Sequence, residues 1–419
     1  MIDVIAEFVK LKVEAFVLKN DKEERLKLYE SILAHHPNKD DYKEKSEKFI
    51  NNLRLNKLSE EQYKQWLIFS MNHFGMHIAT KIYEKNFPYL IDQEINILLE
   101  CYRDILIDKD ISAFGIYAVS QLLNERAPMK CYELTKEAFE TDPNLAQALG
   151  IEGYRYEGKA TEENITHECP FCGEKEEISP YFCSPQVYKL KNRNTFPPAK
   201  LWIKCNKCDN FYTYNFPLFS VGDINGHYTD NGNNIYIKNR FALSAYGHIF
   251  DMIRQHTSGR DYLEIGIGTG EMMATALEYG YNVQGVEICR QDCDTVSNVL
   301  GVEIACCDIV DFETDKKYDV IIMGDVFEHT SKPVAVIEKI STMLKDDGVL
   351  WLSTPNYNCG YARMQGFLHC MWHELNHYTY SSHETVEKIL NDFGMETVHY
   401  SISERYFGSM ELIIKKKYN

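Results

Sequence analysis

The chain has 419 residues, of which 44% are hydrophobic and 26% charged, and its formal net charge is −17. The chain is too long for one ordinary hydrophobic core, which predicts two or three domains. Its composition excludes wholesale disorder. The excess of acid repels polyanions and weakens a nucleic-acid interpretation of the whole chain. The first residues are acidic where a signal peptide is basic, and no apolar run is long enough to span a membrane. We therefore expect a cytoplasmic protein whose 13 cysteines are thiols or metal ligands.

The first part of the chain, residues 1–160, has the pattern of an all-α domain. Apolar side chains recur at three- and four-residue spacing, as in Trp66, Phe69 and Phe74. The segment 129–144, with its Asp-Pro-Asn exit, resembles the second helix of a tetratricopeptide repeat, but no clean repeat period follows. A degenerate helical repeat that binds a protein partner and an ordinary helical bundle both remain open.

Residues 161–220 contain two cysteine pairs, Cys169-Pro-Phe-Cys172 and Cys205-Asn-Lys-Cys208. Four thiolates match tetrahedral Zn²⁺, and because cysteine fills every position, the ion would be structural and not catalytic. A redox pair is the alternative, but the βαβ context of such motifs is missing. We expect a small zinc-ribbon-like module here and a linker over residues 221–239.

The stretch from Ile178 to Cys208 contains six basic residues and no acid. The basic residues are Lys189, Lys191, Arg193, Lys200, Lys204 and Lys207. One interpretation is that they offset the negative charge of a four-thiolate zinc site. The other is a contact for an anionic substrate, such as a nucleotide-linked sugar or RNA.

The remaining residues, 240–419, alternate short apolar runs with helical stretches. A helix over residues 241–255 should lead into this domain. The runs are residues 262–265, 283–288, 302–306, 320–323, 349–353, 397–402 and 411–414. They predict a seven-stranded, doubly wound α/β sheet that is parallel in most pairs. The last two runs leave no room for a helix between them, so they should pair antiparallel at one edge.

A glycine-rich turn, Glu264-Ile-Gly266-Ile-Gly268-Thr-Gly270, follows the first of these strands. Glycines at this place let the backbone approach a ligand at the carboxyl end of the strand. Dinucleotide enzymes use a similar turn, but they need a further Gly or Ala after two residues. This chain has Glu271 there, an acid that a pyrophosphate would disfavour.

The wider pattern resembles the class I S-adenosylmethionine-dependent methyltransferases, which have a Rossmann-like fold. The resemblance covers about residues 240–419 and begins with the glycine turn, which is similar to the family's first motif. It implies that Glu287 accepts hydrogen bonds from both ribose hydroxyls. It also implies that Asp308, followed by Ile309, lies beside the adenine amino group, and that Asp325 lies near the methionine end.

Three histidines are candidates for a base or an acceptor contact: His329 after the fourth strand, and His373 and His377 after the fifth. Histidine suits proton transfer at neutral pH. Packing or capping within a lid is the alternative. The spacing of His373 and His377 also fits two metal ligands on a helix, but no third ligand is evident nearby in the sequence.

The sequence thus predicts S-adenosylmethionine-dependent methyl transfer to a small molecule, such as a sugar or a biosynthetic intermediate, by in-line displacement. S-adenosylmethionine and structural Zn²⁺ are the expected cofactors. An RNA or protein acceptor, docked by the basic stretch or the helical domain, is the first alternative. A scaffold that binds the cofactor without turnover is the second.

Overall fold

The computed structural model describes residues 96, 99, 109–121, 123–156, 163–185, 196–217 and 240–417. The chain divides into two compact units, residues 1–160 with 187–194 and residues 161–186 with 195–419. The predictions on positions 66–74 and on the linker 221–239 lie outside the described residues. Among the described residues, no helix has the length and apolar content needed to cross a membrane.

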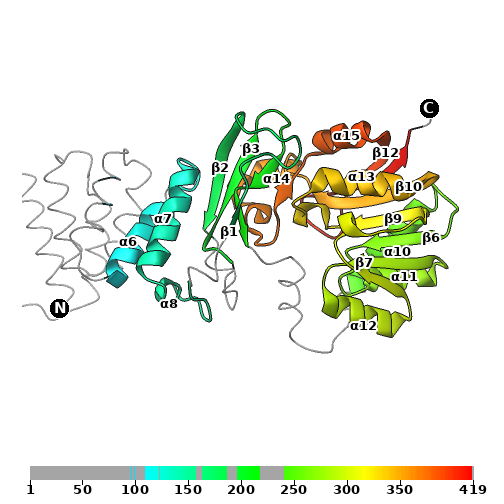
Figure 1. Cartoon of the computed structure of the whole chain (residues 1–419), viewed down its shortest axis with the longest axis horizontal. Helices are drawn as coiled ribbons and strands as arrows, with labels where there is room; N and C mark the ends of the chain where they lie inside the picture. The colour runs from blue at the N-terminus through cyan, green and yellow to red at the C-terminus, as the bar shows by residue number, and fades with distance from the viewer. Residues whose placement is uncertain are drawn as a thin grey trace, which may run out of the picture. The chain divides into compact units, whose positions relative to one another are not determined.

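The described part of the first unit is helical, with α6 (Lys109–Gln121), α7 (Pro128–Thr141) and α8 (Leu145–Ala148) (Figure 1). Helix α7 begins with proline, whose fixed φ suits the first helical position. Its buried face, which includes Leu134, Ala138 and Phe139, follows the helical period, and α7 packs against α6. The helix expected over residues 129–144 is therefore confirmed, whereas the repeat assignment stays a prediction.

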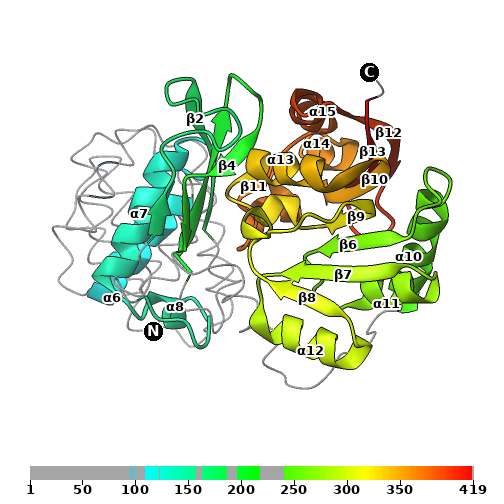
Figure 2. The ribbon, with the colours of Figure 1, turned by 45° about the vertical axis from the view of Figure 1, so that its right-hand side comes forward.

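The second unit contains a seven-stranded sheet with the order β12-β13-β10-β9-β6-β7-β8 (Figure 2). The strands are β6 (Asp261–Ile265), β7 (Asn282–Glu287), β8 (Glu303–Cys306), β9 (Tyr318–Gly324), β10 (Leu344–Pro355), β12 (Met395–Ile402) and β13 (Ser409–Lys416). Strands β6 to β10 pair in parallel, and β13 is antiparallel to both β10 and β12. All seven predicted strands and the antiparallel edge pair are confirmed, and the fold is Rossmann-like.

Helices cover both faces of this sheet (Figure 2). One face carries α10 (Arg240–Ile253), α11 (Glu271–Glu278) and α12 (Arg290–Leu300), and the other carries α13 (Pro333–Met343) and α15 (His383–Asp392). Successive strand residues point to opposite faces, so Tyr262 packs with α10 whereas Leu263 packs with α13. Because both faces are buried, the strands read as nearly continuous apolar runs.

The cysteine-rich region and the α/β domain share a second sheet. Strands β2 (Ile178–Pro185), β3 (Ala199–Cys205) and β4 (Phe211–Thr213) form it together with β11 (Thr379–Tyr380), in the order β11-β4-β3-β2. Two further short strands, β1 (Glu163–Ile165) before β2 and β5 (Asn215–Pro217) after β4, pair antiparallel with each other. The side chains of Trp202, Trp372 and Tyr380 belong to one buried aromatic cluster. The cysteine-rich region therefore packs directly on the segment that follows β10.

Candidate cofactor cavity and acceptor loop

The turn after β6 brings backbone to the carboxyl edge of the large sheet. Gly266, Gly268 and Gly270 have φ angles of +73°, +50° and +79°, which glycine adopts without strain. A Cβ at Gly266 would lie 2.3 Å from Cγ2 of Val326, so this position also requires glycine for space. At Gly268 a Cβ would meet nothing within 4 Å. The turn thus leaves its backbone open to a ligand.

A cavity of about 700 Å³ opens at this edge, a size in the usual range for small-molecule sites. The predicted cofactor residues that line it are Glu264, Gly266, Gly268, Glu287, Asp308, Ile309 and Asp325. Gly270 is not among the lining residues, because it precedes α11 and faces Val296 of α12. The fold therefore brings nearly the whole predicted set together.

Glu287 ends β7 and points an acceptor into the cavity. It is only 6% exposed, and burial raises the pKa of its carboxyl. Its Oε1 accepts a hydrogen bond of 2.8 Å from the amide of Cys289, and its Oε2 accepts a longer one, of 3.4 Å, from Gly268. A carboxylate offers about four acceptor positions. The Glu287 carboxylate can therefore still accept hydrogen bonds from the two hydroxyls of a diol.

Asp308 and Ile309 follow β8 and form a second part of the cavity wall. The Oδ1 atom of Asp308 accepts a hydrogen bond of 2.9 Å from the amide of Val310 and caps the 3₁₀ helix η5 (Ile309–Asp311). The Ile309 side chain is buried. A carboxylate beside an aliphatic side chain suits a flat heterocycle that carries an amino group.

Glu264 is a buried acid on the cavity wall, only 3% exposed. Burial raises the pKa of its carboxyl to about 8, even though the hydroxyl of Tyr262 donates a hydrogen bond of 2.6 Å to Oε2 and lowers it. The nearby charge of Glu287 raises it further. In the absence of a cation, this carboxyl holds its proton at neutral pH.

The raised pKa of Glu264 makes the stability of the cofactor-free chain depend on pH. The unfolded chain loses this proton near pH 4.5, whereas the folded chain keeps it to about pH 8. The native state therefore binds the extra proton between these values, and the free energy of unfolding falls as pH rises through them. Glu264→Gln removes this fall, so urea unfolding should find the variant more stable than wild type by on the order of a few kcal/mol at about pH 8.5. An equal difference at about pH 4.5 would contradict this explanation.

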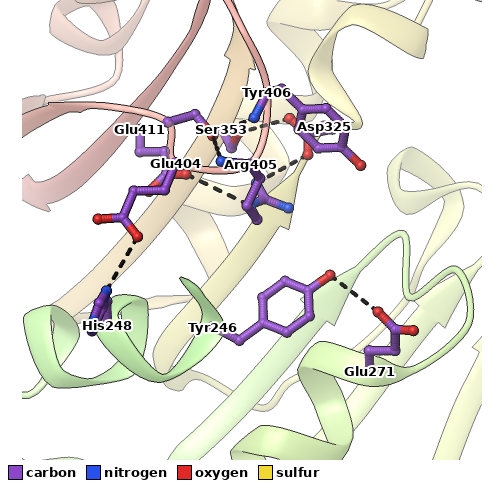
Figure 3. Close-up of polar contacts among 10 residues, drawn as sticks. Tyr246, His248, Glu271, Asp325, Ser353, Glu404, Arg405, Tyr406 and Glu411 are labelled. Atoms are coloured by element: carbon purple, nitrogen blue, oxygen red, sulfur yellow. Dashed lines mark hydrogen bonds and ion pairs between the residues drawn. The ribbon is translucent and has the colours of Figure 1, made fainter. Parts of the chain in front are cut away.

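Asp325 and Arg405 form an ion pair on the cavity wall (Figure 3). Asp325 follows β9 with φ of +55°, a left-handed conformation that is strained for a residue with a side chain. Ser353 holds it there: its carbonyl accepts from the Asp325 amide at 2.9 Å, and its hydroxyl donates to Oδ1 at 2.7 Å. The Nη2 atom of Arg405 lies 3.0 Å from Oδ2, and the arginine side chain is 10% exposed.

Arg405 was not among the residues predicted from the sequence. It lies in the loop between β12 and β13, and since β12 is parallel to β10, this loop returns to the carboxyl edge of the sheet. The direction of β12 in the sheet is therefore the information that would have located Arg405 at the cavity. Tyr246 of α10 lies beside Arg405, with its ring centroid 5.8 Å from the guanidinium carbon, and donates a hydrogen bond of 3.5 Å to Glu271 (Figure 3).

The side chains on the cavity wall include more carboxylic acids than basic groups, although one of the acids, Glu264, keeps its proton at neutral pH in the absence of a cation. The acids are Glu264, Glu271, Glu287, Asp308 and Asp325, and Arg405 is the basic residue among the described lining positions. An excess of acids favours a ligand with positive charge. S-adenosylmethionine, a sulfonium with a ribose diol and a purine, fits both this charge and the acceptors at Glu287 and Asp308.

The structure separates the three candidate histidines. His329 lies in the 3₁₀ helix η6 (Phe327–His329) and lines the cavity, and burial lowers the pKa of its imidazole. Neither His377 nor His373 lines the cavity. The ring of His377 stands edge-on to that of His329 at 4.6 Å between centroids.

His373 instead has the contacts of a packing residue. Its Nδ1 lies 2.7 Å from the hydroxyl of Ser184, and its Nε2 lies 2.8 Å from the carbonyl oxygen of Phe367. Both ring nitrogens are therefore engaged where β2 meets the segment after α14 (Gly360–Gln365). Of the three histidines, His329 is the one placed to reach a ligand, and the position of His373 gives its catalytic assignment no support.

The four cysteines of the two pairs converge on one point. Sulfur atoms are 3.6 Å apart in both Cys169–Cys208 and Cys172–Cys205, and all four lie within 4.8 Å of one another. Tetrahedral zinc with bonds of about 2.3 Å separates its sulfurs by roughly 3.8 Å. Without a cation, burial and the neighbouring thiols raise the pKa of Cys172 to about 11. The donor set and its spacing therefore fit zinc.

Lys200 of β3 anchors the segment that follows β10. The residue is 3% exposed, and its ammonium group donates to three backbone carbonyls, those of Glu374 and Leu375 at 2.6 Å and that of His377 at 2.7 Å. Strand β11 of the same segment pairs with β4. The cysteine-rich region thus holds the loop that carries His377.

The other described lysines of the basic stretch are also paired within the chain. Lys204 lies 3.3 Å from Asp209, and Lys207 lies 3.0 Å from Glu174. The remaining members, at positions 189, 191 and 193, lie outside the described residues. The described part of this stretch therefore offers no row of unpaired cations to a polyanion.

Comparisons with known proteins match the C-terminal part of the chain, which contains the cavity. Residues 238–400 match a family model described as a methyltransferase domain. A ubiquinone biosynthesis O-methyltransferase of Actinobacillus pleuropneumoniae is 28% identical over 120 residues, which cover 25% of this chain and 51% of that protein. A malonyl-acyl-carrier-protein O-methyltransferase of Acetivibrio thermocellus is 26% identical over 173 residues, covering 40% and 56%. The chain thus spans about half the length of the curated relatives it matches.

Among solved structures, a magnesium protoporphyrin IX methyltransferase of Synechocystis with bound S-adenosylhomocysteine is similar to this chain. The TM-score is 0.37 at 16% identity, and the match covers 46% of this chain and 94% of that one. An S-adenosylmethionine-dependent methyltransferase of Clostridium acetobutylicum gives a TM-score of 0.36 at 14% identity, covering 46% and 99%.

Proposed function

We propose that this chain transfers a methyl group from S-adenosylmethionine to a small molecule, because residues 238–400 match the model of a methyltransferase domain. The observation that carries the proposal is the cavity, in which the open glycine turn, Glu287, Asp308 and His329 line one space. When bound there, the cofactor supplies an electrophilic methyl group. Glu287 would hold the ribose, and Asp308 the adenine amino group.

Asp325 and Glu264 would hold the positively charged end of the cofactor. Both line the cavity, and Asp325 is fixed by Ser353 and Arg405 before any ligand binds. Prearranged carboxylates stabilise a cation without further reorganisation. A cation beside Glu264 would also favour release of the proton that burial keeps on this side chain.

His329 is the residue we propose to contact the acceptor. The carbonyl of Asn376 can only accept, so the Nδ1 of His329, 2.8 Å away, must donate to it. This fixes the neutral tautomer that leaves the lone pair on Nε2. Burial lowers the pKa of the ring and keeps it neutral. His329 therefore has the state needed to receive a proton from an acceptor hydroxyl or amine.

A small acceptor is favoured over RNA, because the described lysines of the basic stretch are paired inside the chain. The relatives named above are a ubiquinone biosynthesis O-methyltransferase and a malonyl-acyl-carrier-protein O-methyltransferase, and the first of these names refers to the synthesis of a small molecule. We further propose that the four cysteines bind structural zinc. We also propose a cytoplasmic location, where cysteines persist as thiols or metal ligands.

Isotope transfer from labelled S-adenosylmethionine tests this function. Incubation with a cell extract separated into small molecules, RNA and protein should place the label in the small-molecule fraction. His329→Ala should lower the rate about a hundredfold, whereas His373→Gln, which lies away from the cavity, should keep it. Label in RNA or protein alone would overturn the acceptor class. Tight cofactor binding without release of S-adenosylhomocysteine in any fraction would indicate a scaffold.

A further inference from the structure

We propose that Glu328, His329 and His377 bind a divalent transition-metal ion beside the cofactor cavity. One carboxylate oxygen and one nitrogen from each ring lie within 4.8 Å of one another. Adjacent ligands at bonds of about 2.1 Å are roughly 3 Å apart, a separation that small side-chain rotations toward an ion would reach. Two imidazoles and one carboxylate are a donor set of ions such as Mn²⁺, Fe²⁺ and Zn²⁺.

The backbone holds the two parts of this site together. The amide of Tyr378 donates to the carbonyl of Glu328 at 2.7 Å, and the hydroxyl of Thr379 donates to that of Phe327 at 3.2 Å. The bond from His329 to the carbonyl of Asn376 joins the same two segments. Residues 376–379 are therefore fixed against η6. The site is preorganised, as metal sites in proteins require.

Each proposed ligand is also oriented by a neighbour. His329 donates through Nδ1 to a carbonyl, which leaves Nε2 as its metal-binding atom. The hydroxyl of Tyr380 donates to the carbonyl of Met371, so its oxygen accepts from Nδ1 of His377, 2.7 Å away, and the same tautomer results. The hydroxyl of Thr354 donates to Oε2 of Glu328 at 2.9 Å. Metal-binding histidines usually donate their other ring N–H in this way.

The position of the site suggests its role. His329 belongs both to the proposed ligand set and to the cavity wall, so the ion would lie next to the bound acceptor. With three protein ligands, a divalent ion keeps open positions. Nε2 of His329 is then a ligand of the ion and not the base, and we infer that the open positions bind an oxygen of the acceptor and favour loss of its proton to solvent. This role rests on the proposed methyl transfer, whereas the ion site itself does not.

Titration with Mn²⁺, followed by electron paramagnetic resonance, tests the site on the full chain with its zinc in place. A four-cysteine site selects softer ions, so Mn²⁺ reports on the nitrogen and oxygen ligands. Wild type should bind one Mn²⁺, and His377→Ala and Glu328→Gln should each weaken binding at least about tenfold. His373→Gln, a histidine of the same loop outside the ligand set, should bind Mn²⁺ as wild type does.

Two outcomes would overturn the proposal. One is that wild type binds neither Mn²⁺ nor any Zn²⁺ beyond that of the four cysteines. The other is that His377→Ala and Glu328→Gln, both still folded by circular dichroism, retain wild-type affinity for Mn²⁺. Cofactor binding separates this result from the proposed function, because His377→Ala should still bind S-adenosylmethionine, and Glu287→Gln should still bind Mn²⁺.

Discussion

Glu287→Gln is expected to weaken S-adenosylmethionine binding about a hundredfold. The carboxylate of Glu287 already accepts from the amides of Cys289 and Gly268 and has capacity left for two hydroxyls. Glutamine removes the charge and turns one acceptor into a donor, which would face a hydroxyl proton or a backbone amide. Two charge-assisted hydrogen bonds at about 1.5 kcal/mol each amount to roughly 3 kcal/mol, or a factor of about one hundred in Kd. Isothermal titration calorimetry measures this directly.

Glu303→Gln is the matched control for this substitution. Glu303 begins β8, next to β7 in the same sheet, and its side chain is exposed at the amino end of the strand. It should bind the cofactor as wild type does. If the Glu287 variant is folded and has unchanged affinity, the ribose is held elsewhere, and the assignment of the cavity to this cofactor fails.

Lys200→Met is expected to destabilise the chain by about 4 kcal/mol. The ammonium group satisfies three backbone carbonyls, at positions 374, 375 and 377, in a setting where the lysine is 3% exposed. Methionine keeps the apolar stem but leaves these acceptors without their donor, at a cost of about 1–3 kcal/mol for each that water does not reach. Urea unfolding measures the loss, and amide hydrogen exchange over residues 374–378 should become faster.

Lys204→Met provides the comparison on the same strand. Lys204 makes an ion pair with Asp209, and its side chain is 34% exposed. Partly exposed pairs of this kind contribute less than about 1 kcal/mol. A Lys200 variant that loses no more stability than the Lys204 variant would show that the loop is held by its other contacts, such as the pairing of β11 with β4.

The sheet and the cofactor end of the cavity were predictable because their signals are local. Each strand is a short apolar run, and the turn at Gly266 and Gly268 follows its strand without interruption. The acid of Glu287 ends the next strand. In a parallel sheet, such strand ends meet at one edge, so correct strands already place these residues together.

The acceptor side was less predictable, because its contacts join distant segments. The spacing of His373 and His377 suggested two ligands of one metal ion. The structure places His377 beside Glu328 and His329 instead, and it packs His373 against Ser184. That choice depends on the register of β11 against β4, which no local pattern encodes. The sequence shows Lys200 only as a member of a basic stretch, because its carbonyl partners are more than 170 positions away.

The pairing of β11 with β4 also sets an order for folding during synthesis. Strands β2, β3 and β4 are made early, yet the edge of β4 gains its neighbour only when residues 379 and 380 have left the ribosome. Until then β4 exposes unpaired backbone, and an open strand edge is a template for aggregation. The cysteine-rich region is thus completed by a part of the chain made after five strands of the large sheet. Expression of that region alone would leave a sheet with one strand missing.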